Sequence, residues 1–452
     1  MKLIGLDIGT TTICGLVLDS GTGGILSVVT RPNTSRLPGK AWEALQDPAV
    51  IMGLVREMMD GFLDRFDGVA AIGIAGQMHG ILYVDKAGRA CSPLYTWQDG
   101  RGDLAEAGEP STSAGLSAAL GSRVSTGMGI VTHAFNAAHG LVPREATALC
   151  SIADYAAMAL GDSTVPRMDT SNAASLGCFD FDRLDFRREA IEKLGLDAGL
   201  FPEVTNGFPV LGQAPAGVPV STAAGDNQAS FLGSVREVNS TALFNVGTGS
   251  QVSLYLESAD DIPGVDIRPF PFGGFLAVGA ALCGGTAYSL LRGFFEQTLR
   301  LFGAEAPVSW EAMNAAERPV PGRGALVVDT RFSGTRVDPS VRGSISGIGV
   351  DNFTPENLIA SVREGIAAEL LEFYQRVPAA RRTHVTAVAG SGNGIRLNPA
   401  LRGIFESRLG MKLRVPRHRE ETSFGAALLA GVSTGTLRDL AAAGKLVQYG
   451  EE

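Results

Sequence analysis

Two aspartates each stand at the end of an apolar run, where a carboxylate can take part in chemistry. Asp7 lies in "LIGLDIGTTT" and Asp226 lies in "AAGDNQASFLG". The turn after Asp7 is rich in glycine and threonine, so its backbone N–H groups and hydroxyls could bind an anion while the carboxylate holds a metal ion. A structural explanation is also open, because glycine permits tight turns and threonine suits strands.

The surroundings of Asp226 leave two roles open. Small residues lead into Asp226 and Asn227, and an amphipathic pattern follows them. Asp is a frequent N-cap, so the residue could serve only to begin a helix. It could also be a general base held at the end of a strand. The two roles are compatible with each other.

A third group of polar side chains follows the apolar run Gly68–Gly76. It contains Gln77, Met78, His79, Trp97, Asp99 and Arg101. Donors and acceptors beside an aromatic ring are typical of a site for a polyol or sugar. The structural alternative is a loop with a solvated Asp99–Arg101 pair and a tryptophan in the core.

A glycine loop, "AGSGNG" at residues 389–394, lies between an expected strand and an expected helix. It has neither the G-x-G-x-x-G spacing of a dinucleotide fold nor the G-x-x-x-x-G-K-[ST] spacing of a P-loop. Together with glycine–threonine hairpins, it is a plausible seat for the adenosine of a nucleotide.

The hairpin around Asp7 has a counterpart half a chain later, in "LFNVGTGSQVSLYLE" from Leu243. At an offset of 238 residues, Gly9 falls on Gly247 and Thr10 on Thr248, while Asp7 falls on Asn245. Alternating apolar residues after each turn indicate half-buried antiparallel strands. The repeat predicts two similar domains that present their hairpins to a shared cleft, with a boundary near residues 236–239.

The remaining pattern is typical of α/β domains. A buried strand is expected at residues 68–76. A long amphipathic helix should begin after Thr354 as its N-cap, with Pro355 in its first turn. A second helix should begin after Asn398 and end at Gly410.

Bulk properties restrict the class of protein. A chain of 452 residues is too long for one core, and its net charge of −9 argues against nucleic acid or an anionic membrane as the main partner. The five cysteines are scattered, which indicates free thiols in a reducing compartment. No signal peptide, membrane-spanning run or histidine metal motif is present. We therefore expect a cytoplasmic enzyme or binding protein without a structural metal.

Taken together, the motifs resemble the FGGY family of carbohydrate kinases, within the actin-like ATPase superfamily. "LDIGTTT" and "NVGTGS" resemble the two phosphate motifs of that family. "GQMHG", "TWQDGR", "GDNQAS" and "RVDPSVRGSISG" follow in the order of the family. The resemblance implies two actin-like, ribonuclease H-like α/β domains, 1–236 and 237–452, with the catalytic cleft between them.

The resemblance also implies roles for individual residues. Asp226 would be the catalytic base, and Asp7 would hold Mg²⁺. The phosphates of ATP would meet Gly9, Thr10, Thr11, Thr12, Gly247, Thr248 and Gly249. Gly390, Ser391, Gly392 and Asn393 would border the adenosine. The sugar would face Gln77, Met78, His79, Trp97, Asp99, Arg101 and Asn227.

Several further stretches, among them "TSNAASLGCFD" and "PRHREETSFGAAL", resemble the branch of the family that phosphorylates sedoheptulose. The expected reaction is transfer of phosphate from ATP to the terminal hydroxyl of a ketose, with xylulose or another ketose or polyol as the alternative substrate. An actin-like chaperone or a non-catalytic sugar sensor are the alternatives outside this activity. The expected partners are the sugar and ATP, and a homodimer stays open.

Overall fold

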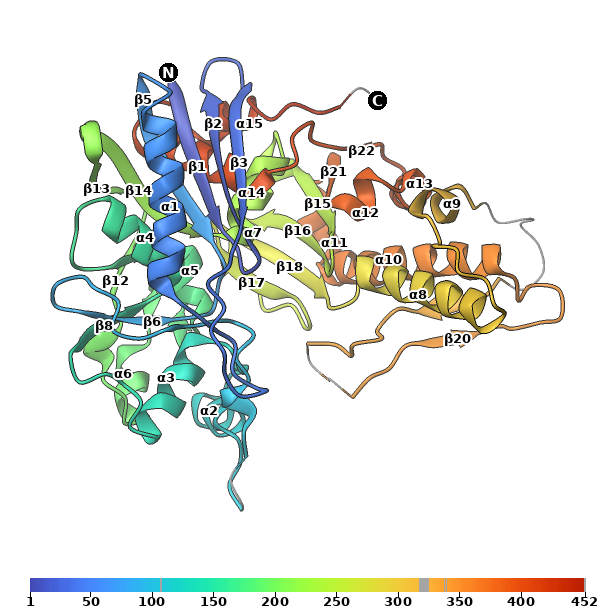
Figure 1. Ribbon diagram of the computed structural model, residues 1–452, viewed down its shortest axis with the longest axis horizontal. Coiled ribbons are helices and arrows are strands. Elements are labelled where there is room, and N and C mark those ends of the chain that lie inside the picture. The colour runs from blue at the N-terminus through green and yellow to red at the C-terminus, as the bar shows by residue number, and fades with distance from the viewer. Residues whose placement is uncertain (106–107, 317–324, 337, 339, 451–452) are drawn as a thin grey trace. The chain divides into compact units, whose positions relative to one another are not determined.

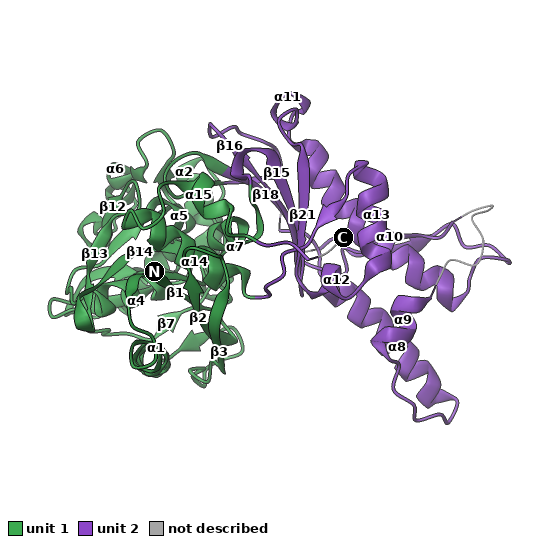
Figure 2. Ribbon diagram, turned by 90° about the horizontal axis from the view of Figure 1, so that it is seen from above, with its two compact units in different colours: residues 1–236, 268–275, 420–447 green, residues 237–267, 276–419, 448–452 purple. Residues whose placement is uncertain are grey.

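The structure is a computed structural model that describes all residues except 106–107, 317–324, 337, 339 and 451–452. The described chain divides into two compact units (Figure 2). The first unit contains residues 1–236, 268–275 and 420–447, and the second contains residues 237–267, 276–419 and 448–452. By contacts, the chain therefore returns to the first unit twice after residue 236, whereas the domains expected from the sequence, 1–236 and 237–452, are contiguous.

The first unit is built on a mixed six-stranded sheet, and β1 and β2 form the predicted hairpin (Figure 1). β1 pairs antiparallel with β2 and parallel with β5, which occupies the expected buried strand. In sheet order the strands are β13 (Val210–Ala214), β14 (Val218–Gly225), β5 (Val69–Gly76), β1 (Lys2–Ile8), β2 (Thr12–Asp19) and β3 (Ile25–Pro32).

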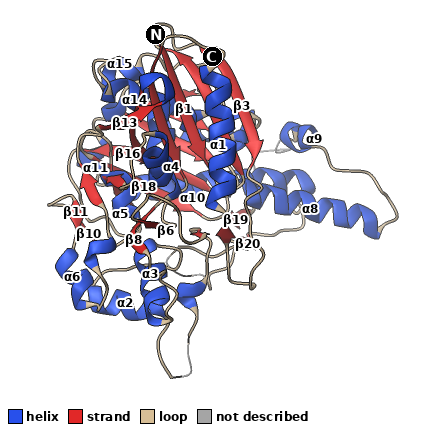
Figure 3. Cartoon of the chain, turned by 60° about the vertical axis from the view of Figure 1, so that its left-hand side comes forward, coloured by secondary structure: helices blue, strands red, loops and turns tan. Residues whose placement is uncertain are grey.

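Helices cover both faces of this sheet (Figure 3). The side chains of Ile4, Leu6 and Ile8 belong to the same buried cluster as residues of α1 (Pro48–Leu63) and α4 (Ile152–Leu160). Side chains alternate along a strand, so Leu3, Gly5 and Asp7 point to the opposite face. There α7 (Asp226–Ser234) packs against α14 (Glu421–Ser433).

Close packing explains why α14 belongs to the first unit. A side-chain Cβ at Gly5 would lie 1.8 Å from the carbonyl oxygen of Ser423, so only glycine lets the helix approach β1 this closely. The other returning segment, residues 268–275, is anchored by Phe270, whose ring packs edge-on against Phe231 of α7. Burial of apolar side chains therefore stabilises both segments, α14 and residues 268–275, against the first unit.

The remaining elements of the first unit surround the sheet and its loops. The helices are α2 (Thr112–Leu120), α3 (Gly129–Ala138), α5 (Thr170–Ser175), α6 (Arg188–Lys193) and α15 (Leu440–Gly444). Short 3₁₀ turns are η1 (Arg101–Asp103), η2 (Ala198–Leu200) and η3 (Pro215–Gly217). Two-stranded pairs join β4 (Leu45–Gln46) to β7 (Leu94–Tyr95), β6 (Leu82–Asp85) to β8 (Ala146–Cys150), β9 (Arg167–Asp169) to β12 (Glu203–Thr205) and β10 (Phe179–Asp180) to β11 (Asp185–Phe186).

The second sheet repeats the central order of the first. Its strands are β17 (Asp266–Pro269), β18 (Phe275–Ala281), β16 (Ser250–Leu256), β15 (Thr241–Val246), β21 (Ala387–Ser391) and β22 (Leu413–Arg414). β15 pairs antiparallel with β16 and parallel with β21, as β1 does with β2 and β5.

The two hairpins differ in the length of their turns. Ile8 pairs with Ile13 in the first hairpin, whereas Val246 pairs with Ser250 in the second. The second turn is therefore one residue shorter. By register, Ser250 corresponds to Ile13 and not to Thr12, so the offset of 238 residues holds only up to the turn.

The second unit contains two helices whose ends match the sequence signals. The Thr354 side chain caps α10 (Pro355–Arg376), and the Asn398 side chain caps α13 (Pro399–Leu409), which ends at Gly410 in a left-handed conformation. These caps were predicted correctly. The other elements are α8 (Gly285–Leu301), α9 (Trp310–Ala315), α11 (Ala379–Arg382), α12 (Asn393–Arg396), η4 (Val238–Ser240) and the pair β19 (Val327–Asp329) and β20 (Ser344–Ser346).

Candidate active site

Asp7 lies near the carboxyl end of β1, on the face covered by α14. Its antiparallel partner in β2 is Cys14, whose carbonyl oxygen accepts a hydrogen bond from Ser423 Oγ at 3.2 Å. This bond fixes the first turn of α14 against the hairpin. Glu420, the N-cap residue directly before α14, is thereby held close to Asp7.

The surroundings of Asp7 favour a bound cation. Its Oδ1 atom is buried and has no hydrogen-bond partner among the described residues. Burial raises the pKa of the Asp7 carboxyl well above its usual range, and the negative charges of Asp226 and Glu420 raise it further. A divalent cation would neutralise this concentration of negative charge. Asp7 and Asp226 were predicted from the sequence, whereas Glu420, which lies 194 residues beyond Asp226 within "PRHREETSFGAAL", was given no role.

The turn of the first hairpin is fixed by hydrogen bonds to Gly9, while its threonine side chains are exposed to solvent. Gly9 N donates to Thr12 O at 3.0 Å, and the Asn33 side chain donates to Gly9 O at 2.9 Å. The Thr11 and Thr12 side chains are exposed. They are therefore accessible to an anion, as the sequence predicted. Asn33 was missed, because its contribution depends on the pairing of β2 with β3.

Thr10 joins this turn to the residues expected to bind a sugar. Its hydroxyl donates to Gln77 Oε1 at 3.1 Å and accepts from Trp97 Nε1 at 3.0 Å. Trp97 is 46% exposed, so it is not the core residue of the structural alternative. The structure thus brings Thr10, Gln77 and Trp97 together.

Asp99 and Arg101 lie away from the surface. Asp99 is 0% and Arg101 is 2% exposed, and Arg101 also donates to Asn136 Oδ1 at 2.6 Å. The guanidinium carbon lies 4.2 Å from the centre of the Tyr95 ring. The pair is therefore neither solvated nor accessible to a sugar, and its hydrogen bonds fix the loop that carries Trp97.

Met78 and His79 follow β5, and Met78 lies against Gly225, the residue directly before Asp226. Met78 is buried, and its sulfur would lie 2.7 Å from a side chain at Gly225. His79 has a left-handed backbone, with φ of 72°, and its Nδ1 lies 2.8 Å from the carbonyl oxygen of Ser175. A carbonyl can only accept, so Nδ1 carries the proton. Strained residues of this kind concentrate at functional sites.

Asp226 is the first residue of α7 and directly follows β14. The N-cap of the helix is Gly225 and not Asp226, which corrects the capping alternative. Asp226 is half-buried. The Oδ1 atom of the neighbouring Asn227 is buried without a partner among the described residues. The site residues Asp226 and Asn227 therefore present polar groups at the carboxyl end of β14.

The second hairpin has a glycine-rich turn that supports the start of α8. Gly247 N donates to Gly249 O at 2.9 Å, and Gly285 N donates to Gly247 O at 2.7 Å. Thr248 is exposed, and its carbonyl accepts from the Thr286 hydroxyl at 3.0 Å. This turn resembles the first in composition, but it is stabilised by a helix start.

The glycine loop after β21 contacts the second hairpin. Asn245 Nδ2 donates to Ser391 Oγ at 2.7 Å, and Ser391 is fully buried. Gly392 has a φ of 80°, and a side chain there would lie 2.5 Å from Val246 O. Asn393 is exposed and begins α12. Only Gly392 and Asn393 are thus placed to meet a ligand directly.

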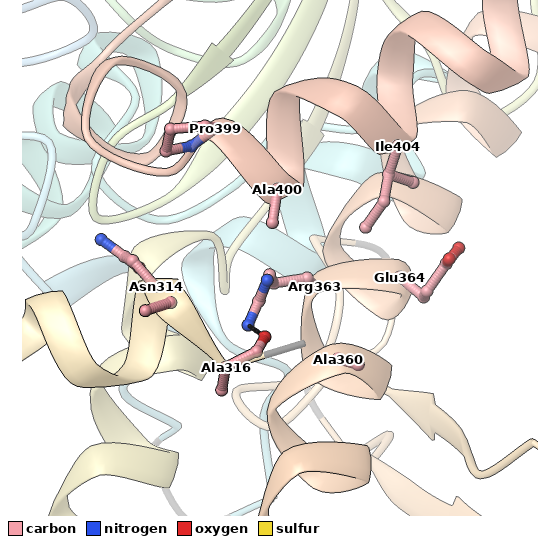
Figure 4. A pocket seen from close by; sticks show the side chains of 9 residues that line it. Asn314, Ala316, Ala360, Arg363, Glu364, Pro399, Ala400 and Ile404 are labelled. Carbon is pink, nitrogen blue, oxygen red and sulfur yellow. Dashed lines mark hydrogen bonds between the residues drawn. The ribbon is translucent and has the colours of Figure 1, made fainter. Parts of the chain in front are cut away.

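A separate cavity of about 560 Å³ lies between α9, α10 and α13 (Figure 4). Arg363 lines it, and its guanidinium donates to the carbonyl oxygens of Met313 and Ala316 at the end of α9. None of the site residues predicted from the sequence lines this cavity.

The described residues lack two kinds of feature. They contain no group of three or more His, Cys, Asp and Glu side chains that could hold a metal ion. A helix long and apolar enough to cross a membrane was not found among them either.

Two sheets of equivalent central order, each with a glycine–threonine hairpin, define a duplicated actin-like α/β kinase fold. Residues 2–233 match a family model described as the FGGY family of carbohydrate kinases, N-terminal domain, and residues 242–434 match the C-terminal domain of the same family. The chain belongs to the FGGY family and is an ATP-dependent carbohydrate kinase.

Relatives within the family act on different substrates. The chain is 25% identical to the sedoheptulokinase of Mus musculus over 94% of this chain and 96% of that protein. It is 26% identical to a glycerol kinase of Geobacter sp. (strain M21), over 96% and 90%. Among solved structures, a gluconate kinase from Lactobacillus acidophilus matches with a TM-score of 0.84 and 19% identity, over 100% and 92%.

Proposed function

We propose that this kinase transfers phosphate from ATP to the terminal hydroxyl of a ketose, sedoheptulose, giving sedoheptulose 7-phosphate. The observation that carries the chemistry is the proximity of Asp7 and Asp226, two carboxylates at the carboxyl ends of β1 and β14, the strands on either side of β5 in the first sheet. The similarity to the mouse sedoheptulokinase supports the choice of sugar.

Asp226 is the catalytic base in this proposal. A sugar hydroxyl is a poor nucleophile until its proton begins to leave, and a carboxylate within hydrogen-bond distance can accept that proton. The terminal oxygen then attacks the γ-phosphorus of ATP, and ADP leaves in line. Since Gly225 caps α7, the carboxylate of Asp226 is not needed to begin the helix.

Asp7 would hold Mg²⁺ in this proposal. Its buried, unpartnered Oδ1 and the nearby charges of Asp226 and Glu420 fit a divalent cation. Mg²⁺ keeps several waters and takes few protein carboxylates, so a single direct or water-mediated ligand suits it. When bound, the ion would neutralise charge on the phosphates of ATP.

Each hairpin would bind phosphate groups of ATP in this proposal. Thr11 and Thr12 are exposed in the first hairpin and Thr248 in the second, whereas Gly9, Gly247 and Gly249 are half-buried. The adenosine would lie against Gly392 and Asn393, with Gly390 and Ser391 supporting the loop from within.

The sugar would meet Gln77, His79, Trp97 and Asn227. Met78, which lies against Gly225, and the Asp99–Arg101 ion pair, which fixes the Trp97 loop, would position these residues. Exposed indole and buried amide groups together suit a ligand that has both C–H and O–H faces.

A panel of ketoses and polyols in a coupled assay of ATP consumption tests the proposal. Sedoheptulose should give the highest kcat/KM, with xylulose as the second candidate and glycerol and gluconate as comparisons. Asp226→Asn serves as the control for contaminating kinases. Higher kcat/KM with xylulose or glycerol would overturn the choice of sugar. The homodimer and the cytoplasmic location expected from the sequence stay predictions.

A further inference from the structure

A closed circuit of hydrogen bonds through Gln46 links the first hairpin to Gln77 and Trp97, two residues proposed to bind the sugar. Gln46 Nε2 donates to Thr10 O at 2.8 Å, and Gln46 Oε1 accepts from Gln77 Nε2 at 2.8 Å. Gln77 Oε1 in turn accepts from the Thr10 hydroxyl, which accepts from Trp97 Nε1. The circuit thus leaves Thr10 through its hydroxyl and returns to its carbonyl.

Chemistry fixes the direction of every bond in this circuit. An indole N–H can only donate and a backbone carbonyl can only accept. The proton of the Thr10 hydroxyl must therefore point to Gln77, and both glutamine amides have a single compatible orientation. Gln46 and Gln77 are 4% and 3% exposed, so water does not compete for these bonds. Bonds that point one way around such a chain strengthen one another.

From this circuit we infer that Gln46 is a positioning residue. It holds the first hairpin and the proposed sugar-binding residues Gln77 and Trp97 in one arrangement. The inference rests on the proposed function for its kinetic consequence. Gln46 belongs to β4, a two-residue strand paired with β7, so it sits on the segment next to the loop that carries Trp97. It needs no contact with either substrate, because it acts through Thr10 and Gln77.

The test compares Gln46→Met with a matched control, Thr222→Val. Methionine keeps the length of glutamine but removes both hydrogen bonds. Thr222 is also fully buried and donates one bond of 2.8 Å, to Pro209 O, outside the circuit. Gln46→Met should lower kcat/KM for the ketose about tenfold, and Thr222→Val should change it less than about twofold. Equal kinetic effects of the two variants, in an active unmodified enzyme, would overturn the inference.

A second readout does not depend on activity. The chain has three tryptophans, so labelling with ¹⁵N-tryptophan gives three indole N–H signals, and Trp97→Phe assigns one of them. Gln46→Met should shift the Trp97 signal, and Thr222→Val should leave it unchanged. An unshifted signal in Gln46→Met would refute the circuit. If the unmodified protein phosphorylates no ketose while the signal shifts, the proposed function fails and the circuit stands.

Gln46→Asn replaces Gln46→Met if the latter does not fold. Asparagine keeps a buried amide, but it is one methylene too short to reach both Thr10 and Gln77. The same kinetic loss and the same shift of the Trp97 signal are expected. Wild-type values of both in Gln46→Asn would count against a positioning role.

Discussion

Arg101 Nε lies 2.6 Å from Asp99 Oδ1, in an ion pair from which water is almost completely excluded. Asp99 Oδ2 also accepts from the backbone N–H of Ala44 at 3.0 Å. The pair therefore joins the Trp97 loop to the segment that leads into β4. Its role is structural support for the loop that carries Trp97.

Removal of one member of this pair should destabilise the fold. Arg101→Met leaves the Asp99 carboxylate buried without its partner, which typically costs about 3–5 kcal/mol of unfolding free energy. Urea denaturation measures the change. Arg438→Met, which breaks the exposed pair with Asp439, is the control and should change stability by less than about 1 kcal/mol. Similar losses in both variants would show that burial does not set the value of the Arg101 pair.

Asp226→Asn should leave the fold and ATP binding intact while kcat falls by about 10² or more, because an amide cannot accept the proton of the sugar hydroxyl. Steady-state kinetics with sedoheptulose and calorimetry with ATP measure the two effects. Near wild-type kcat would place the base elsewhere.

Asp7→Asn should separate function from stability. It should weaken binding of Mg²⁺ with ATP and nearly abolish turnover, yet raise the thermal unfolding temperature, since a buried carboxylate without a partner is costly. Asn245→Asp is the control. It makes the opposite change, from amide to carboxylate, at the corresponding place in the second hairpin. Normal activity of Asp7→Asn at limiting Mg²⁺ would remove Asp7 from the metal site.

Stability should fall as the pH rises through the range in which Asp154 ionises. Burial raises the pKa of Asp154 from 3.8 to about 7, so between these values the folded state holds a proton that the unfolded chain has lost. Asp169 acts in the same direction up to about pH 6, since burial raises its pKa too. The amide in Asp154→Asn can bond Ser151 and Asn172. This variant should reduce the pH-dependent loss of unfolding free energy by on the order of a few kcal/mol. Urea denaturation from pH 4 to pH 8 measures it, and an unchanged slope would contradict the assignment.

His133 should produce the opposite dependence. Burial lowers its pKa from 6.5 to about 4, so the unfolded chain binds a proton first and stability falls as the pH drops through this window. His133→Phe should remove that loss in acid and leave the Asp154 effect unaltered. If the acid limb persists in the variant, other groups cause it.

Local signals made part of this structure predictable. The caps of α10 and α13 each reside in a few adjacent residues, Thr354 with Pro355 and Asn398 with Pro399, so the sequence alone was sufficient. The repeated hairpin could also be read from its alternation and its glycines. The one-residue difference between the turns could not, because register depends on which strands pair.

The supports of the site were not predictable in the same way. Gln46 and Asn33 act on the first hairpin through segments that reach it only in the folded chain. Burial of Asp99 and Arg101 depends on Tyr95 and Asn136, which no motif connects to them. Residues expected to bind or react lie in recognisable sequence motifs. The residues that support them come together only through tertiary packing.

The return of α14 to the first sheet sets an order of events during protein synthesis. The helix that covers Leu3 and Gly5 leaves the ribosome about 400 residues after the β1–β2 hairpin. At roughly 5–20 residues per second, one face of the sheet waits on the order of tens of seconds for its cover. During that interval the nascent first unit exposes an apolar surface suited to a chaperone, and the sheet is fully covered only after α14 has emerged.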